Sequence, residues 1–265
     1  MINQKPHVLG FQFQITIGWL YPELMSTYGD RGNILYFQKR CEKQGVKTHL
    51  RPIDASFSLE QFNEVDFIFG GGSQDMEQEL VMRDLKGKKA EALKEKIEKG
   101  TPALFVCGSP QLMGRFYEPG AGKRIDGLGI FDMESVHPGI HVSRCIGNTV
   151  GEVYWGNLNT QERDNVIIGF ENHGGRTTLG KNALPFAKVI VGFGNNGVDK
   201  TEGVVYKNAV GCYYHGPFLP KNPSVADFFI ERIIEVKYGE KIQLKEQMDV
   251  YEKKAREVML ERHLR

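Results

Sequence analysis

The sequence of 265 residues predicts an α/β protein with a mostly parallel, doubly wound sheet flanked by helices. Two observations support this fold class. In the first half, short apolar runs alternate with helical patterns, the order that builds a parallel sheet covered on both faces. Beyond Gly120, short runs between glycine-rich turns replace this alternation, so we expect additional antiparallel strands in the second half.

The first half contains four expected strands with helices between them. The expected strands cover residues 8–17, 46–51, 65–69 and 103–106. The spacing of apolar residues predicts helices over 32–44, over 76–99 with a break near Gly87, and opening within 111–117. Strands and helices therefore alternate as they do in βαβ units.

The second half has shorter strands and one clear helix. Apolar runs at 140–146, 166–170, 188–193 and 203–206 are expected to be strands, and 225–236 predicts an amphipathic helix. The sequence has no internal repeat and no Pro-rich linker, so we expect one domain over 1–240. A highly charged helix is expected over 241–265, either solvated or docked against a partner subunit.

Charge and composition exclude several classes of function. The 34 basic and 33 acidic side chains leave a formal net charge of +1, which argues against bulk electrostatic binding to nucleic acid or to an anionic membrane. The N-terminus lacks a signal-peptide pattern, and the longest apolar runs are too short to span a membrane. The four cysteines form no CxxC pair, and the histidines do not cluster with them at the spacing of zinc ligands. We therefore expect a reduced, cytoplasmic protein without a metal site.

Cys107 is the first candidate for chemistry. It follows the expected strand 103–106 and precedes Gly108 and a plausible helix start. Ligands of open parallel sheets bind at the carboxyl ends of the strands, and a strand–turn–helix presents a nucleophile there. A helix N-terminus also favours the reactive thiolate. The alternative is a buried cysteine that acts as a small hydrophobic residue.

A cysteine nucleophile needs a base, which is usually a histidine. His215 lies where the sequence GCYYHGP runs from a strand into a tight turn, so it too stands at a strand end. His173, in the sequence FENHGGR, is the rival. The other five histidines have no comparable setting and are interpreted as surface or loop residues.

Three consecutive glycines, Gly70 to Gly72, follow the expected strand 65–69. Glycines at a strand end let backbone amides approach a ligand closely, as an anion or oxyanion site requires. The sequence matches neither a Walker loop nor GxGxxG. A simple tight turn is the alternative interpretation.

The order of these motifs resembles that of the class I glutamine amidotransferases, whose fold is flavodoxin-like. The resemblance is closest to their cobyric-acid-synthase-like branch, and within it to the glutaminase subunits of lipid II isoglutaminyl synthases. It runs from about residue 12 to residue 240. The motifs, in chain order, are YGDRGN at 28–33, GGG at 70–72, CG at 107–108, GFENHGGRT at 169–177, GNN at 194–196 and YHGP at 214–217.

The resemblance implies a role for each matching residue. Cys107 would form a glutamyl thioester and release ammonia, with His215 as general base and acid. The amides of Gly71, Gly72 and Gly108 would form the oxyanion hole. Three further residues would line the glutamine pocket: Gln111 and Arg144, which would hold the substrate, and His173, which would be structural rather than catalytic. The arginine suits the α-carboxylate because it can bind it in a bidentate manner.

Two departures from the resembled pattern stand out. Phe105 and Ser109-Pro110 flank the Cys107-Gly108 pair, so the turn is less glycine-rich than usual. Pro217 occupies the position where other class I amidotransferases have a glutamate. The site therefore resembles a Cys–His dyad, and we hypothesise that a carboxylate from a partner subunit orients His215.

The resemblance also implies partners. L-glutamine would be the substrate, and a MurT-like Mur ligase subunit would form a heterodimer with this chain. ATP and Mg²⁺ would act on that partner, with no cofactor here. Lipid II would be reached through the complex at the inner face of the bacterial membrane. Corrinoid amidation is an alternative, although corrinoid enzymes usually carry a fused ATP-dependent domain for which 265 residues leave no room. A catalytically silent regulatory subunit is the other.

Overall fold

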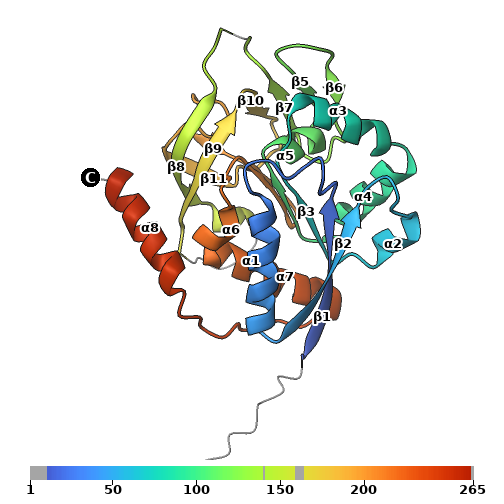
Figure 1. The fold of residues 1–265 in the computed structure, drawn as a ribbon, viewed down its shortest axis with the longest axis vertical. Coiled ribbons are helices and arrows are strands. Elements are labelled where there is room, and N and C mark those ends of the chain that lie inside the picture. The colour runs from blue at the N-terminus through green and yellow to red at the C-terminus, as the bar shows by residue number, and fades with distance from the viewer. Residues whose placement is uncertain (1–10, 140, 159–163, 264–265) are drawn as a thin grey trace, which may run out of the picture.

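The computed structural model describes residues 11–139, 141–158 and 164–263. A six-stranded sheet forms its centre (Figure 1). In spatial order its strands are β13 (Val204–Tyr206), β14 (Ala209–Cys212), β4 (Ala103–Val106), β3 (Phe67–Gly70), β1 (Phe13–Leu20) and β2 (Val46–Ile53). All neighbours pair in parallel except β13, which is antiparallel to β14. The expected doubly wound α/β class is confirmed.

Helices cover both faces of this sheet (Figure 1). The helices on one face are α1 (Arg31–Lys43) and α7 (Pro223–Tyr238), and those on the other are α2 (Leu59–Asn63), α3 (Asp75–Asp84) and α4 (Lys88–Glu98). Strand β3 shows why two cores form. Its side chains alternate, so Phe67 packs between Phe37 of α1 and Phe229 of α7, while Ile68 belongs to the opposite core.

The strand bounds depend on pairing partners more than on local alternation. The expected strand 8–17 is instead Phe13–Leu20, and residues 8–10 lie outside the described part of the chain. Its eight residues pair one to one with β2, from Phe13 opposite Val46 to Leu20 opposite Ile53. The two helices expected over 76–99 are confirmed as α3 and α4, with Gly87 at a positive φ of 53° between them.

Two four-stranded sheets make up most of the second half. One consists of β10 (Arg176–Leu179), β7 (Met133–Val136), β5 (Phe116–Glu118) and β6 (Ile125–Asp126), and the other of β12 (Thr201–Glu202), β11 (Ala187–Val191), β8 (Cys145–Val153) and β9 (Val166–His173). The strand expected at 140–146 is wrong, because β8 starts at Cys145, where its pairing with β9 begins, and Ile140 lies outside the described residues. A short 3-10 helix, Trp155–Leu158, connects β8 toward β9.

The C-terminal region differs from the single helix expected over 241–265. Gly239, at a φ of 72°, ends α7, and only Val250–His263 forms the final helix, α8. The segment between the two helices is not helical, and its residues Ile242 and Leu244 pack against the core. Arg256 then fixes α8 to its own chain, through bonds to the carbonyls of Val166 and Lys221. No described helix is long and apolar enough to cross a membrane.

Candidate active site

The nucleophile candidate Cys107 occupies a strained turn at the carboxyl end of β4. Its backbone lies at φ 55° and ψ −99°, a region that side chains other than glycine rarely adopt. Helix α5 (Gly108–Met113) starts at the next residue, so the turn is the sharp strand-to-helix elbow that exposes a nucleophile. The Cys107 N–H donates to the Cys212 carbonyl of β14 at 2.8 Å, which ties the turn to the neighbouring strand.

Ser109 explains how the elbow tolerates its unusual flanking residues. Its Oγ donates to the Gly71 carbonyl at 2.6 Å, so the residue that takes the place of a glycine bonds the elbow to the triglycine loop. The helix expected to open within 111–117 begins earlier, at Gly108, directly after the nucleophile.

His215 follows β14, the strand next to β4, and its side chain is fully buried. Its backbone bonds to Phe170 of β9 in both directions, which holds the residue in place at the end of the sheet. Tyr28 covers the ring in an edge-on contact, with centroids 4.9 Å apart. The two strand ends that the sequence singled out therefore meet.

Asp30 lies against His215 as a third member of the Cys107–His215 site, and the sequence did not point to it. Its Oδ1 accepts from His215 Nδ1 at 3.1 Å, and its Oδ2 accepts from the Gly72 N–H at 2.6 Å. With Nδ1 engaged, the only nitrogen left for the thiol of Cys107 is Nε2, which is buried and has no other hydrogen bond to described residues. The carboxylate that orients His215 thus belongs to this chain, which corrects the hypothesis of a carboxylate from a partner.

The electrostatics of this group favour a charged imidazole. Burial opposes the charge on His215, but the neighbouring Cys107 and Asp30 outweigh it and hold the pKa of His215 well above its ordinary value. A protonated imidazole beside a thiolate is the resting form of a cysteine nucleophile. The arrangement can therefore perform acyl transfer.

The backbone amides around Cys107 are not equally available to an oxyanion. The Gly72 N–H already serves Asp30, so it is a poor candidate for the expected oxyanion hole. The Gly108 N–H stands at the first position of α5, where helical amides lack intrahelical acceptors. The next amide after Gly72, that of Ser73, lies 3.0 Å from where a Cβ of Gly108 would be. The Ser73 amide nitrogen therefore lies beside Gly108, and these two amides are the candidates for the oxyanion hole.

A cavity of about 410 Å³ opens beside Cys107. This size is within the range usual for small-molecule sites. Of the residues predicted to bind substrate, Gln111, Arg144 and His173 all line it, together with the first turn of α3. Arg144 is exposed, and its Nε and Nη2 donate to the side-chain and backbone oxygens of Asn172, each at 3.1 Å. The structure therefore brings the predicted residues to one cavity.

Gln111 and His173 are held by a buried polar chain. Gln111 accepts from Gln78 Nε2 at 3.0 Å and donates to the Tyr213 hydroxyl at 3.2 Å. His173 stacks on the Tyr213 ring at 3.8 Å, and its Nδ1 donates to the Gly175 carbonyl at 2.8 Å. Through these contacts with Tyr213 and Gly175, His173 supports the cavity wall.

Comparison with known proteins identifies the family. Residues 16–223 match the model of the CobB/CobQ-like glutamine amidotransferase domain. The chain belongs to this family. The amidotransferase is 35% identical to "Lipid II isoglutaminyl synthase (glutamine-hydrolyzing) subunit GatD" of Streptococcus pneumoniae, over 91% of this chain and 88% of that protein. It is 36% identical to the subunit of the same name from Staphylococcus aureus, over 94% and 96% of the two chains.

More distant relatives share the fold or the domain. A probable cobyric acid synthase of Methanothermobacter thermautotrophicus is 27% identical, with 72% of this amidotransferase covering 40% of that protein. Two solved glutamine amidotransferases have TM-scores of 0.55 and 0.51 at 11% and 14% identity. The first match covers 82% of this chain and 98% of the other, and the second, from Thermotoga maritima, 92% and 93%. The predicted class I amidotransferase fold is confirmed.

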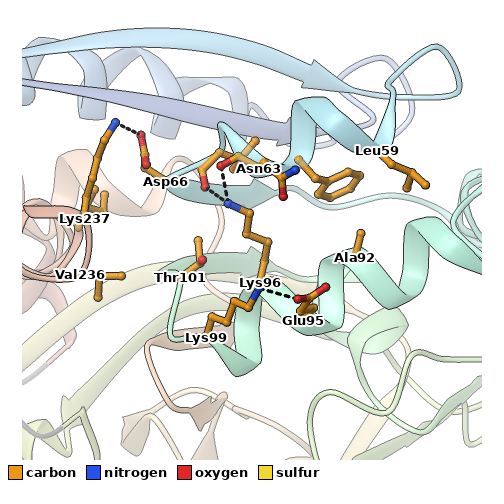
Figure 2. Close-up of a pocket in the computed structure, with 13 residues that line it drawn as sticks. Leu59, Asn63, Asp66, Ala92, Glu95, Lys96, Lys99, Thr101, Val236 and Lys237 are labelled. Carbon is orange, nitrogen blue, oxygen red and sulfur yellow. Dashed lines mark hydrogen bonds and ion pairs between the residues drawn. The ribbon is translucent and has the colours of Figure 1, made fainter.

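A second cavity, of about 420 Å³, lies at the opposite edge of the amidotransferase sheet (Figure 2). Its lining residues include Asp66, which directly precedes β3, and Thr101, which lies two residues before β4. Lys96 donates to the carbonyls of Asn63 and Val65, and Lys237 pairs with Asp66 at 2.7 Å. These two ammonium groups already have partners, and the described residues that line this cavity include no cysteine or histidine, so the cavity beside Cys107 is the better candidate for the site.

Gly72 offers a sharp test of this amidotransferase site. A Cβ there would lie 2.6 Å from His215 Cε1 and 3.3 Å from Cys107 Cβ, so Gly72→Ala must displace the imidazole. Since a misplacement of about 1 Å can reduce turnover about 100-fold, we expect kcat for glutamine hydrolysis to fall by about that factor. Gly156→Ala is the control, because its Cβ meets nothing within 4 Å. Equal kcat values in the two variants would contradict the placement of Gly72.

Proposed function

We propose that this chain is the glutaminase subunit of a lipid II isoglutaminyl synthase. It hydrolyses glutamine and delivers ammonia to a MurT-like, ATP-dependent ligase that amidates the D-glutamate of the lipid II stem peptide. The observation that carries the proposal is the Cys107–His215–Asp30 group at the cavity. The match to GatD subunits over nine-tenths of the chain supports the choice of product.

In the first half-reaction, the Cys107 thiolate attacks the side-chain carbonyl carbon of glutamine. The oxygen that becomes negative is stabilised by the amides of Gly108, the first residue of α5, and of Ser73 in the loop before α3. As the C–N bond breaks, protonated His215 gives its Nε2 proton to the departing nitrogen, so ammonia leaves and a glutamyl thioester remains. Asp30 keeps the ring in the orientation that this transfer requires.

In the second half-reaction, water hydrolyses the thioester. His215, now neutral, takes a proton from the attacking water, and the C–S bond breaks to release glutamate and regenerate the Cys107 thiolate. The strained backbone of Cys107 keeps its sulfur at the cavity through both steps. No redox partner or metal is required for this sequence of steps.

Arg144 is the residue proposed to hold the α-carboxylate of the substrate. Its Nε and Nη2 are anchored by Asn172, and no described hydrogen bond engages its Nη1, which lies near Gly174 at the cavity. A guanidinium fixed in this way is preorganised for a carboxylate. Gln111 borders the same space and contributes shape, since both ends of its amide already have protein partners.

The ATP-dependent step is assigned to the partner. The sequence has no Walker-type phosphate loop, and its charged groups at the cavity suit an amino acid rather than a nucleotide. The proposed complex is a heterodimer that works in the cytoplasm and reaches lipid II at the inner face of the membrane. Corrinoid amidation is the second candidate, and the lower identity of 27% to a cobyric acid synthase makes it the weaker one.

Reconstitution tests the proposal. The chain, a MurT-like ligase, ATP, Mg²⁺ and lipid II are incubated with glutamine labelled with ¹⁵N in its side-chain amide. We expect the label to appear in the amide of the D-isoglutamine residue, measured by mass spectrometry of the stem peptide. Label that reaches a corrinoid acid with its own synthetase but never lipid II would favour the second candidate. Absence of glutamate release would contradict both.

A further inference from the structure

Glu202, the last residue of β12, carries a buried carboxyl group that the mechanism above does not use. The residue is 1% exposed, and its Oε1 accepts from the Tyr213 N–H at 2.7 Å. Its Oε2 is also buried and has no hydrogen bond partner among the described residues. Acidic side chains are rarely buried in this way unless they are paired, so this one calls for a reason.

The amide that Glu202 holds belongs to the peptide group between Cys212 and Tyr213. The carbonyl of that same peptide group accepts from the Cys107 N–H at 2.8 Å. Because a peptide group is planar, its N–H and its carbonyl turn together. Glu202 therefore fixes the direction of the carbonyl that ties down the nucleophile elbow, and it does so two residues before His215.

The register of the strands explains why a side chain holds this amide. Val204 of β13 lies opposite Gly211 of β14. Two residues further along, this antiparallel register places Glu202 opposite Tyr213. The Glu202 carbonyl is already engaged, because it accepts from the Phe186 N–H at 3.1 Å. The carboxyl oxygen therefore takes the place of a backbone acceptor at the end of β14.

Glu202 is itself held in place by the GNN motif at 194–196. The side-chain oxygen of Asn195 accepts from the Gly203 N–H at 2.9 Å, and its nitrogen donates to Thr201 Oγ1 at 2.9 Å. Asn195 thus bonds to the residues on both sides of Glu202. The motif therefore fixes the short segment from which the Glu202 carboxyl reaches β14.

The carboxyl of Glu202 is uncharged at neutral pH. Burial, together with the negative charge of Glu171, raises its pKa to about 8, although the Tyr213 N–H and His215 act in the opposite direction. An uncharged carboxyl still has a carbonyl oxygen that accepts the amide hydrogen, and it leaves no unpaired charge at Oε2. At neutral pH the group therefore supplies an acceptor to the end of β14.

We propose that Glu202 is a positioning residue for glutamine hydrolysis. It holds the peptide group between Cys212 and Tyr213 in the orientation that keeps the thiol and the imidazole of the site aligned. The inference rests on the proposed glutaminase function. It adds that the side chain acts by reaching the Tyr213 amide and that its charge is not needed.

Two substitutions separate reach from charge. Glu202→Gln keeps the length and the acceptor oxygen but cannot ionise, whereas Glu202→Asp keeps the carboxyl but is one methylene too short for the Tyr213 N–H. We expect kcat for glutamine hydrolysis to stay within about threefold in Glu202→Gln and to fall about 100-fold in Glu202→Asp, because a misplacement of about 1 Å at the reacting groups can have that effect. Glutamate release at saturating glutamine and neutral pH, with the ligase present, measures both values.

Asp199→Asn is the control in the same loop. Asp199 is exposed, and its carboxylate also holds a backbone amide, that of Thr201 at 2.8 Å, so we expect this variant to keep the kcat of the wild type. Thermal unfolding shows whether each variant is folded, and if Glu202→Asp is not, Glu202→Gln alone decides the question.

A large loss of kcat in Glu202→Gln would assign the role to the charge and overturn the inference. Wild-type kcat in a folded Glu202→Asp would overturn it as well, since the amide would then need no acceptor. Both outcomes leave the glutaminase proposal intact. A wild-type chain that releases no glutamate would instead overturn that proposal.

Discussion

Cys107→Ala is expected to abolish glutamine hydrolysis and glutamine-dependent amidation, while amidation driven by added ammonium salt through the partner persists. The sulfur is the only atom removed, and it is the atom that forms the thioester. Because the alanine Cβ fits the space that Cys107 already occupies, the elbow and the partner interface should be unaffected. Glutamate release measures the first half of the prediction, and amide formation with ammonium chloride measures the second.

Cys41→Ala is the matched control for this variant. Cys41 is also buried but lies in α1, away from the carboxyl end of β4. We expect it to keep the glutaminase activity of the wild type. If Cys107→Ala still released glutamate, the nucleophile assignment would be wrong. If it lost ammonium-driven amidation as well, the residue would be needed for assembly and not only for chemistry.

Local sequence nominated Cys107 and His215 as candidates, and the family resemblance then implied their roles. Each follows a short apolar strand and precedes a glycine, and the chemistry of a thiol needs an imidazole, so residue type and position coincide. Parallel neighbours β4 and β14 then bring the two strand ends together. The family resemblance rested on the same residues, and the family match confirms it.

Asp30 could not be found in this way because its role depends on tertiary contact. It lies 185 residues from His215, directly before α1, and its carboxylate is one of 33 in the sequence. The YGDRGN motif at 28–33 was a signal, since it stands in the turn region that follows β1 at the same edge of the sheet. The turn lies beside the triglycine loop because β1 pairs in parallel with β3, and the sequence alone does not reveal that pairing.

The ends of several elements were also beyond local reasoning. Strand β8 starts at Cys145 because β9 ends opposite it at His173, and no pattern within 140–146 encodes that limit. Likewise, α8 starts only at Val250. Its position is fixed by Arg256, which reaches Asn222 and the carbonyl of Val166 far earlier in the chain. Charge pattern alone therefore predicted the helix but not its length.

Asp30→Asn is expected to lower kcat for glutamine hydrolysis by about 10⁴-fold, the scale seen when the orienting carboxylate of a catalytic histidine is replaced by an amide. Asp30 accepts from two donors, His215 Nδ1 and the Gly72 N–H. An asparagine has one acceptor oxygen, so its NH₂ must face one of them. If the NH₂ group faces Nδ1 of His215, it forces the wrong tautomer of the imidazole. Facing Gly72, it disrupts the loop beside Cys107.

The same variant should change the pH profile of kcat/KM. Asp30 is one of the two charges that hold the pKa of His215 above its ordinary value, so removing it lowers that pKa. The thiolate–imidazolium pair exists only below the pKa of the histidine. The alkaline limb, where the imidazolium loses its proton, should therefore move to lower pH. Initial rates at low glutamine concentration across the alkaline range measure the shift.

Asp66→Asn is the control, because Asp66 pairs with Lys237 at the opposite edge of the sheet, and we expect its alkaline limb to stay in place. The decisive comparison is Asp30→Asn alone and in complex with the ligase. If Asp30 orients His215, both preparations lose activity and both show the displaced limb. If a carboxylate of the partner does so, the complex keeps the activity and the pH profile of the wild type. That outcome would restore the partner to the role that the structure gives to Asp30.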